Sequence, residues 1–223
     1  MFCPLTGVGL VGSSVISQII SSPTLRQSLS IVALQNSKKL LLSPSSSVLS
    51  SEQSWKSALQ SSSESAKAPK DLIPTLTKIQ EESKKHTVVI DNTSNDDVAS
   101  AYPDFLKAGF SIVTPNKKAY SGSKQLFDNI ISSIQPASSS QKPPLIYLES
   151  TVGAGLPIIS TLKDLIATGD EIVKIEGVLS GTLSYIFNVW CPASLDSTDK
   201  FSDVVKVAKD NGYTVRNPEH DSY

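Results

Sequence analysis

The alternation of short apolar runs with amphipathic segments is the feature that most restricts how this chain can fold. Between residues 29 and 149, apolar runs of strand length are separated by segments with apolar side chains at helical spacing. The expected strands are 29–34, 87–91, 110–114 and 145–149, and the expected helices are 71–85, 98–108 and 123–134. Strands that alternate with helices form a mostly parallel sheet, because each crossover helix packs back on one face. The sequence therefore predicts an α/β fold with helices on both faces of its sheet.

The pattern changes after Glu149, and the 223 residues are enough for one large domain or two small ones. A helix is expected over 156–167, a strand with one solvent-exposed face over 171–179, and helices over 183–190 and 201–211. We therefore predict a first domain over residues 1–150 and the beginning of an α+β domain over 151–223. A serine-rich stretch, 43–68, is expected to be a surface excursion with one short helix.

Composition and charge exclude several classes of protein. Twenty basic and 21 acidic side chains leave a net charge of -1, which argues against nucleic-acid binding. The sequence has no apolar run of the ~18–20 residues that a membrane span needs, and its N-terminus has no basic region typical of a signal peptide. Cys3 and Cys191 are too far apart for a zinc module or a disulfide framework. We therefore expect a cytoplasmic protein that binds neither a membrane nor nucleic acid.

A Gly-x-Gly-x-x-Gly pattern opens an apolar helical segment near the N-terminus. Its residues are Gly7, Gly9 and Gly12, with Leu10 and Val11 between the last two glycines. Such a loop lets the backbone approach a pyrophosphate, which the helix N-terminus attracts. The pattern alone is also compatible with a plain turn, but its position before a helix and then a strand favours a Rossmann-like dinucleotide-binding loop.

The residues on either side of this loop qualify the prediction. Pro4 cannot donate a hydrogen bond to a central sheet ladder, so we expect the first strand to be damaged, shortened or missing. After the second strand, the segment 35–39 contains no acid for a ribose 2′-hydroxyl but does contain two lysines. This favours NADP over NAD as the cofactor, and a solvated loop is the alternative.

Several later segments resemble homoserine dehydrogenase, in particular the short monofunctional type found in fungi. The segments are Asp91–Ser94, Thr114–Ala119, Glu149–Pro157, Ile175–Asn188 and Phe201–Thr214. The resemblance implies reduction of L-aspartate 4-semialdehyde to L-homoserine with NAD(P)H, on the route to threonine and methionine. It also implies a homodimer and a small-molecule substrate as partner.

The resemblance assigns roles at the ends of two strands. Asn92 and Thr93 would line the nicotinamide end of the cofactor. Gly212 belongs to a segment that resembles a helix end near cofactor and substrate, and it would bind the cofactor. Lys117 would contact the cofactor and act catalytically, by polarising the substrate oxygen or relaying its proton. Without the family, Asn92 and Thr93 would be turn residues and Lys117 a solvated lysine.

The resemblance also implies a monovalent-cation loop and a substrate-binding segment. The cation, such as sodium, would be held by oxygen atoms of Glu149, Val152, Ala154 and Leu156. An ordinary glycine-rich hinge between domains is the alternative for this loop. The implied substrate-binding residues are Gly181, Thr182, Tyr213 and Asp221.

The likeness to the family fails at both ends of the sequence. Val215 stands where the family has a glutamate for the substrate ammonium, and the family's lysine-bearing helix has no counterpart. We therefore expect a chain truncated at both ends, with exposed apolar surface, poor solubility and little or no turnover. A catalytically inactive nucleotide-binding or regulatory partner is the alternative. The spacing of Tyr120 and Lys124 also fits short-chain dehydrogenases, but the glycine between them disfavours that interpretation.

Overall fold

The chain divides into two compact units, which are described separately. The computed structural model describes residues 1–135, 142–194 and 198–213. Unit 1 is Met1–Leu148 and unit 2 is Glu149–Tyr223. In the described part of the chain, no helix has both the length and the apolar character to cross a bilayer.

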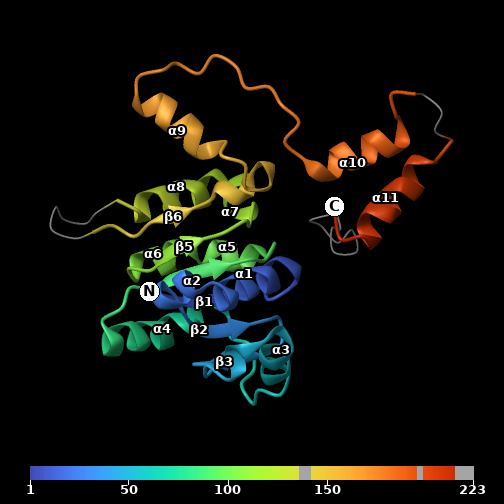
Figure 1. The fold of residues 1–223 in the computed structure, drawn as a ribbon. Helices are drawn as coiled ribbons and strands as arrows, with labels where there is room; N and C mark the ends of the chain where they lie inside the picture. Colours follow the sequence, from blue (N-terminus) through green and yellow to red (C-terminus); the bar gives the residue numbers. More distant parts are fainter. Residues whose placement is uncertain (136–141, 195–197, 214–223) are drawn as a thin grey trace. The chain divides into compact units, whose positions relative to one another are not determined.

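Unit 1 is built on a six-stranded sheet with the order β3-β2-β1-β4-β5-β6 (Figure 1). The strands are β1 Phe2–Thr6, β2 Ser30–Gln35, β3 Leu40–Leu42, β4 Val88–Asp91, β5 Ser111–Val113 and β6 Ile146–Tyr147. All neighbouring strands are parallel except β2 and β3. The predicted mostly parallel α/β sheet is therefore confirmed, and the antiparallel β3 is an addition that the sequence pattern did not indicate.

The prediction that the first strand is shortened or missing is wrong. β1 occupies the centre of the sheet, where it pairs with β2 on one edge and with β4 on the other. The register with β2 shifts between Cys3 and Pro4, so that Cys3 faces Ile31 but Pro4 faces Ala33. A bulge of this kind disrupts the ladder locally, so the missing N–H of Pro4 falls where the regular pairing is already interrupted.

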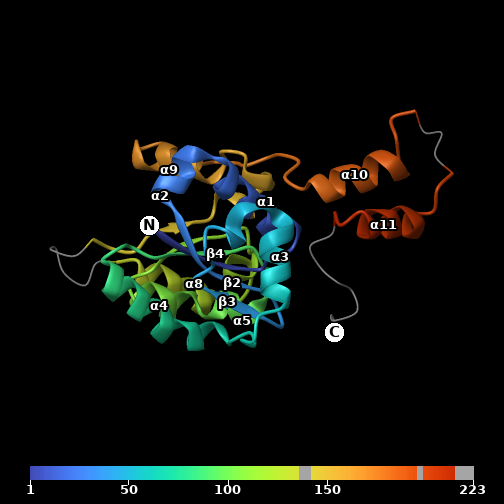
Figure 2. The ribbon, with the colours of Figure 1, turned by 60° about the horizontal axis from the view of Figure 1, so that its bottom comes forward.

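Helices cover the sheet of unit 1 on both faces, as predicted. Val89 and Ile90 follow each other in β4 and enter different core clusters, because successive side chains of a strand point to opposite faces. One cluster lies under α1 (Leu10–Ser21) and α3 (Glu52–Gln60). The other lies under α4 (Pro69–Ser83), α5 (Asp96–Ser100), α6 (Tyr102–Lys107) and α8 (Lys124–Ser133). Figure 2 shows α1 and α2 (Pro23–Ser28) on one side of the strands and α4 on the other.

The serine-rich stretch contributes to the core, which corrects its interpretation as a surface excursion. α3 places Trp55 and Leu59 in the cluster under α1, and these side chains are 1% and 2% exposed. The serines around them serve as local hydrogen-bonding groups, as when Ser51 caps α3 by accepting a hydrogen bond from the Ser54 backbone N–H. Serine abundance in this stretch therefore reflects turns and helix ends around a buried apolar stripe.

Unit 2 is mainly helical in its described residues. After two short 3-10 turns, Glu149–Thr151 and Gly153–Gly155, it contains α9 (Ile159–Ala167), α10 (Gly181–Trp190) and α11 (Phe201–Asp210). A small core forms where Ile186 of α10 meets Val204 and Ala208 of α11.

The strand expected over 171–179 does not form. Val173 is 92% exposed and Val178 is 82% exposed, although the alternation of apolar residues is typical of a strand. A strand needs a hydrogen-bonding neighbour, and the described residues of unit 2 contain no other strand with which it could pair.

We predict that Trp55→Ala destabilises unit 1 by about 3–5 kcal/mol, because it removes a large buried side chain and leaves a cavity. Trp190 is 40% exposed, so Trp190→Ala is the matched control and is expected to have a smaller effect. Chemical denaturation followed by far-UV circular dichroism measures both changes. Equal destabilisation by the two variants would contradict the assignment of Trp55 to the core.

Candidate functional site

The candidate site lies where the strand order of the sheet reverses. β1 leads through α1 to β2 on one side, whereas β4 on its other edge begins the second half of the sheet. In sheets of this type, ligands bind beyond the carboxyl ends of the strands at such a point. Gly7 follows β1 here and Asn92 follows β4, and the Asn92 backbone N–H donates to the Thr6 carbonyl oxygen at 2.9 Å. The two loops therefore leave adjacent strands side by side.

Gly7 and Gly12 are required by close packing. Gly7 has φ +81°, and a Cβ built there would lie 2.6 Å from Thr93 Cγ2. A Cβ on Gly12 would lie 2.1 Å from the Gly7 carbonyl oxygen, so α1 packs directly on the turn that precedes it. Both positions therefore exclude a side chain for reasons within the protein.

Gly9 differs from the other two glycines, because no atom lies within 4 Å of a Cβ built there. It is the N-cap of α1, and it has no side chain with which to cap the helix. Leu10 and Val11 follow in the first turn with exposures of 84% and 53%. The first N–H groups of a helix have no partner within the helix, so this open, uncapped end suits an anion whose approach requires bare backbone.

Asn92 presents an unsatisfied donor to the same loop. Its Nδ2 atom is buried and has no hydrogen-bond partner among the described residues. The atom lies 3.5 Å from the position of a Cβ on Gly12. A buried polar atom without a partner carries a free-energy cost that a ligand or water can relieve. The glycine loop and Asn92, both predicted as cofactor-binding, are therefore brought together in unit 1.

Thr93 connects this loop to the one that follows β5. Its backbone N–H donates to Asp91 Oδ1 at 2.8 Å, and its Oγ1 lies 3.4 Å from Asn116 Nδ2. Lys117 is the next residue after Asn116 and is the N-cap of the short helix α7 (Lys118–Ser121). Thr93 thus contacts the glycine loop on one side and the segment that carries Lys117 on the other.

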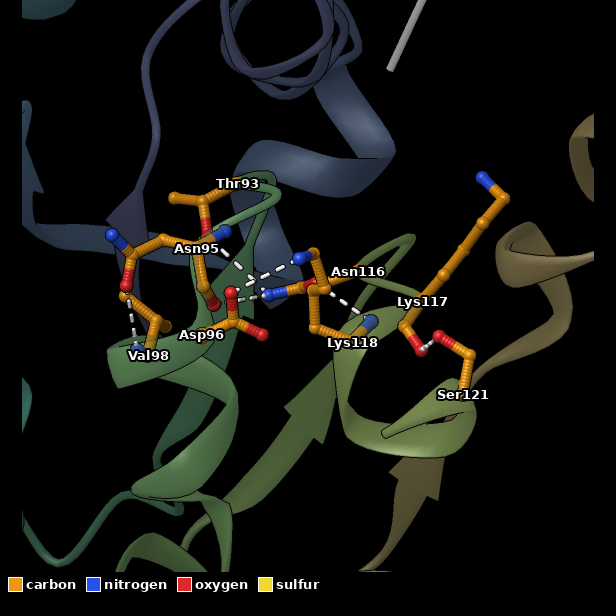
Figure 3. Close-up of polar contacts among 8 residues, drawn as sticks. All are labelled: Thr93, Asn95, Asp96, Val98, Asn116, Lys117, Lys118 and Ser121. Atoms are coloured by element: carbon orange, nitrogen blue, oxygen red, sulfur yellow. Dashed lines mark hydrogen bonds and ion pairs between the residues drawn. The ribbon is translucent and has the colours of Figure 1, made fainter. Parts of the chain in front are cut away.

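The two adjacent lysines of this segment have different surroundings (Figure 3). Lys118 Nζ forms an ion pair with Asp96 Oδ2 at 3.0 Å. Lys117 is exposed, its side chain extends away from the loop, and its ammonium group contacts no hydrogen-bond acceptor within the part of the chain that the structure describes. The Lys117 backbone, in contrast, is held by the Ser121 hydroxyl, which donates to its carbonyl oxygen at 3.0 Å. Lys117 therefore combines a fixed backbone with an available cation.

The two lysines on which the NADP prediction rests lie in the loop after β2 and differ in their contacts. Asn36 Oδ1 accepts hydrogen bonds from the backbone N–H groups of Lys38 and Lys39 at 2.8 and 2.7 Å. Lys39 Nζ donates to the Ser62 carbonyl oxygen at 2.6 Å, so this cation already has a partner. Lys38 is exposed. Of these two lysines, Lys38 is the more available to a ligand.

Sequence reasoning missed four buried polar residues beneath these loops. They are Asp91, Tyr102, Thr114 and Asn116, each at most 1% exposed. Tyr102 Oη donates to Asp91 Oδ2 at 2.6 Å, and Asn116 Nδ2 donates to the same oxygen at 3.0 Å. The available signal was an aspartate at the end of an otherwise apolar strand, which requires buried partners if it stays in the sheet.

Glu149, predicted as a cation ligand, caps a helix in unit 2. Its two carboxylate oxygens accept hydrogen bonds from the backbone N–H groups of Ile159 and Ser160, each at 2.9 Å, at the start of α9. Desolvation alone would raise the pKa of the Glu149 carboxyl, but hydrogen bonds from residues 158–160, the largest from the backbone of Ser160 and Ile159, outweigh it and lower this pKa. Each carboxylate oxygen keeps a further lone pair, so capping does not prevent ligation of a cation.

The other predicted cation ligands follow Glu149 in the same loop. Ala154 has φ +54°, between two glycines that also have positive φ. The carbonyl oxygen of Val152 accepts a hydrogen bond from Gly155 at 3.3 Å, and that of Leu156 accepts one from Ile158 at 2.7 Å. The described residues contain no cluster of three histidine, cysteine or acidic side chains, so a cation in this loop would depend mainly on carbonyl oxygens.

Two predicted substrate-binding residues of unit 2 meet in space. Thr182, in the first turn of α10, donates through its hydroxyl to the Tyr213 carbonyl oxygen. The Tyr213 ring packs edge-on against Tyr185 with 5.0 Å between ring centroids. Gly181 begins α10, and Gly212 follows the C-cap of α11 with φ +73°. Asp221 lies outside the described residues.

We predict that Gly12→Ala lowers the stability of unit 1 by about 1–3 kcal/mol, because the new methyl group must displace the Gly7 carbonyl. Gly9→Ala is the matched control, and its melting temperature is expected to stay close to that of the unmodified chain. Differential scanning calorimetry compares the two variants. A Gly12→Ala melt identical to that of Gly9→Ala would contradict the close packing of α1 on its turn.

Comparison with known proteins finds two family models along the chain. The model for "Homoserine dehydrogenase, NAD binding domain" matches residues 7–139, and the model for "Homoserine dehydrogenase" matches residues 157–222. The homoserine dehydrogenase of Schizosaccharomyces pombe is 54% identical over 134 residues, which cover 60% of this chain and 34% of that protein. The one from Emericella nidulans is 41% identical over 226 residues, covering 99% of this chain and 58% of that protein.

A solved structure with the same fold is a hyperthermophilic archaeal homoserine dehydrogenase in complex with NADPH. It has a TM-score of 0.69 at 21% sequence identity, over 99% of this chain and 64% of that one. This chain therefore spans about a third to two thirds of the length of these relatives. The NAD-binding family model alone matches more than half of the 223 residues, and the chain belongs to the homoserine dehydrogenase family.

Proposed function

We propose that this chain takes part in the NAD(P)H-dependent reduction of L-aspartate 4-semialdehyde to L-homoserine, with unit 1 binding the dinucleotide. The observation that carries the proposal is the meeting of three loops at the carboxyl edge of the sheet. Gly7 packs against Thr93, and Thr93 Oγ1 lies 3.4 Å from the Asn116 amide, next to Lys117. The loop after β4 thereby links an open helix end that suits an anion to the segment that carries an available cation, an arrangement that could hold a dinucleotide and a substrate together.

The residues of unit 1 fit a dinucleotide at specific points. The open N-terminus of α1 at Gly9 suits the pyrophosphate, and the orphan Asn92 Nδ2 gives a donor for a ligand beside the glycine loop. When bound, the reduced nicotinamide supplies the hydride. Lys117 would donate a hydrogen bond to the substrate carbonyl oxygen, stabilise the negative charge that develops there and deliver a proton to it.

NADP is the preferred cofactor within this proposal. Lys38 and Lys67 lie on two segments near the end of β2, and the Gln35 side chain joins them by hydrogen bonds to the Lys67 backbone at 3.0 and 3.1 Å. A ribose 2′-phosphate carries charge that such lysines can neutralise. The structural relative solved with NADPH agrees with this preference.

Further parts of the proposal concern unit 2. A monovalent cation such as sodium would be held by Glu149 and the carbonyl oxygens of Val152, Ala154 and Leu156. The substrate's amino-acid group would meet Gly181, Thr182 and Tyr213. Homodimerisation is supported by apolar side chains that unit 2 exposes on α10 and α11, among them Leu183, Phe187 and Phe201.

Nucleotide binding without turnover is a second candidate function, favoured because the open helix end at Gly9 and the orphan Asn92 Nδ2, which both suit a nucleotide, lie together in unit 1. Titration with NADPH and assay of aldehyde-dependent NADPH oxidation separate the two functions. Binding together with oxidation supports the dehydrogenase, and binding alone supports the nucleotide-binding protein. Absence of NADPH binding would overturn both.

We predict that Lys117→Met lowers kcat for aldehyde reduction by about 10²–10⁴-fold, because the donor to the substrate oxygen is lost. The affinity for NADPH should change much less. Lys118→Met is the matched control, since this neighbouring lysine is already paired with Asp96. Equal kcat losses in both variants would show that Lys117 has no distinct role.

We predict that Lys38→Ala weakens NADPH binding by about tenfold and leaves NADH binding unchanged, because only NADPH carries the 2′-phosphate. Fluorescence titration of each reduced cofactor measures the two dissociation constants. Lys39→Ala provides the comparison, since Lys39 contacts Ser62 and should affect both cofactors to a similar, smaller extent. A Lys38→Ala variant that weakens both cofactors equally would refute a 2′-phosphate contact.

A further inference from the structure

The buried carboxylate of Asp91 organises the loops of the proposed site. Asp91 is fully buried at the carboxyl end of β4 and forms no ion pair with any lysine or arginine of the described residues. Its Oδ1 accepts a hydrogen bond from the Thr93 backbone N–H at 2.8 Å. Its Oδ2 accepts one from Tyr102 Oη at 2.6 Å and one from Asn116 Nδ2 at 3.0 Å. Both oxygens are therefore satisfied by donors from three different segments.

Tyr102 and Thr114 determine which groups donate and which accept the hydrogen bonds of this network. Tyr102 has one hydroxyl proton, which the carboxylate of Asp91 takes as acceptor. The Thr114 hydroxyl oxygen lies 2.8 Å from Tyr102 Oη, so Thr114 donates to Tyr102, and Thr114 Oγ1 in turn accepts the Asn116 backbone N–H at 2.8 Å. Burial raises the pKa of Tyr102, and the nearby negative charge of Asp91 and their hydrogen bond raise it further. Tyr102 therefore keeps its proton and remains a donor.

Asn116 joins the two loops directly. Its Nδ2 donates to the Asn95 carbonyl oxygen at 3.0 Å in addition to Asp91, and its Oδ1 accepts the Lys118 backbone N–H at 3.1 Å. Figure 3 shows the Asn116 amide between Thr93 and Asn95 on one loop and Lys117 and Lys118 on the other. The Asn116 side chain thus contacts the loop after β4, while its backbone leads into Lys117.

Burial of a carboxylate without a cation carries a desolvation cost, so it is an inefficient way to stabilise a core. Apolar side chains of similar volume usually serve as well or better, whereas a fully satisfied polar network specifies one geometry. We therefore interpret the burial of Asp91 as a requirement for a fixed arrangement of the loops rather than as a contribution to the free energy of folding.

We propose that Asp91, Tyr102, Thr114 and Asn116 form a positioning network that fixes Thr93 and Lys117 relative to each other. This inference rests on the proposed function in assigning those two residues to cofactor and substrate. None of the four network residues touches the reactants in this scheme. They act through the backbone of the loops 92–95 and 114–117.

Paired tyrosine variants test the network. Tyr102→Phe removes a hydroxyl that donates to Asp91, whereas Tyr120→Phe removes a buried hydroxyl that has no partner in the described ranges. We expect Tyr102→Phe to speed hydrogen–deuterium exchange of both loops by about tenfold and Tyr120→Phe to leave it unchanged. In the enzyme assay, Tyr102→Phe should lower kcat by about tenfold with little change in the KM for NADPH, because the lysine is displaced while the phosphate loop is intact.

A second pair keeps the test decisive if Tyr102→Phe does not fold. Thr114→Val removes the hydroxyl at nearly constant volume, and Thr114→Ser retains it. Faster exchange in Thr114→Val, with restoration in Thr114→Ser, supports the network, and identical exchange in the two variants overturns it. Hydrogen–deuterium exchange can be measured without turnover. Failure to bind NADPH would refute the proposed function, and the exchange rates would still show whether the positioning network exists. Slower kcat in Tyr102→Phe and Tyr120→Phe alike would also overturn the inference.

Discussion

The pairing of β1 on both of its edges is the constraint on which the rest of unit 1 depends. β1 has five residues and lies between β2 and β4, so the chain leaves this strand at Gly7 with a neighbouring strand on each side. The Gly7 backbone N–H donates to the Gln35 carbonyl oxygen, and the Asn92 N–H donates to that of Thr6. The turn into α1 and the loop after β4 are therefore anchored to the same strand end, which leaves no space for side chains at Gly7 and Gly12.

The candidate site depends on this arrangement, and different interactions hold each of its loops in place. Close backbone packing holds the glycine loop, and hydrogen bonds to one buried carboxylate hold the loops after β4 and β5. Lys118 is tied to Asp96, so that Lys117 is the neighbour whose ammonium stays available. Under the proposed function, Lys117, whose ammonium has no partner among the described residues, would be oriented toward the reacting oxygen before the substrate arrives.

Much of the fold of unit 1 could be predicted from local patterns, and its failures have physical causes. The helices and parallel strands follow apolar periodicity, which each segment carries by itself. Pro4 led to the wrong prediction for β1, because the bulge opposite Pro4 depends on pairing with β2. That strand is distant in the sequence, since Phe2 pairs with Ser30, 28 residues later. The strand expected over 171–179 has the right alternation but finds no neighbour in the described residues, since alternation describes a face and pairing requires a second strand.

The candidate site shows the same division. Gly7, Gly9 and Gly12 could be recognised because their spacing is itself the signal, and Thr93 and Lys117 because they follow strands in segments that resemble one family. Tyr102 and Asn116 could not be connected with Asp91, because these residues are 11 and 25 positions apart and meet only when β4, α6 and the β5 loop are assembled.

The sequence by itself therefore determined the α/β class, the glycine loop and the family to which this chain belongs, since all three are encoded in short-range spacing and residue identity. Only the tertiary structure decided that Pro4 lies in a central strand, that Trp55 is in the core, that Glu149 caps a helix and that Asp91 is the centre of a buried network. Each of these depends on which distant segment supplies the neighbour. Hydrogen-bond partners and packing contacts are properties of assembled elements, and no single segment carries them.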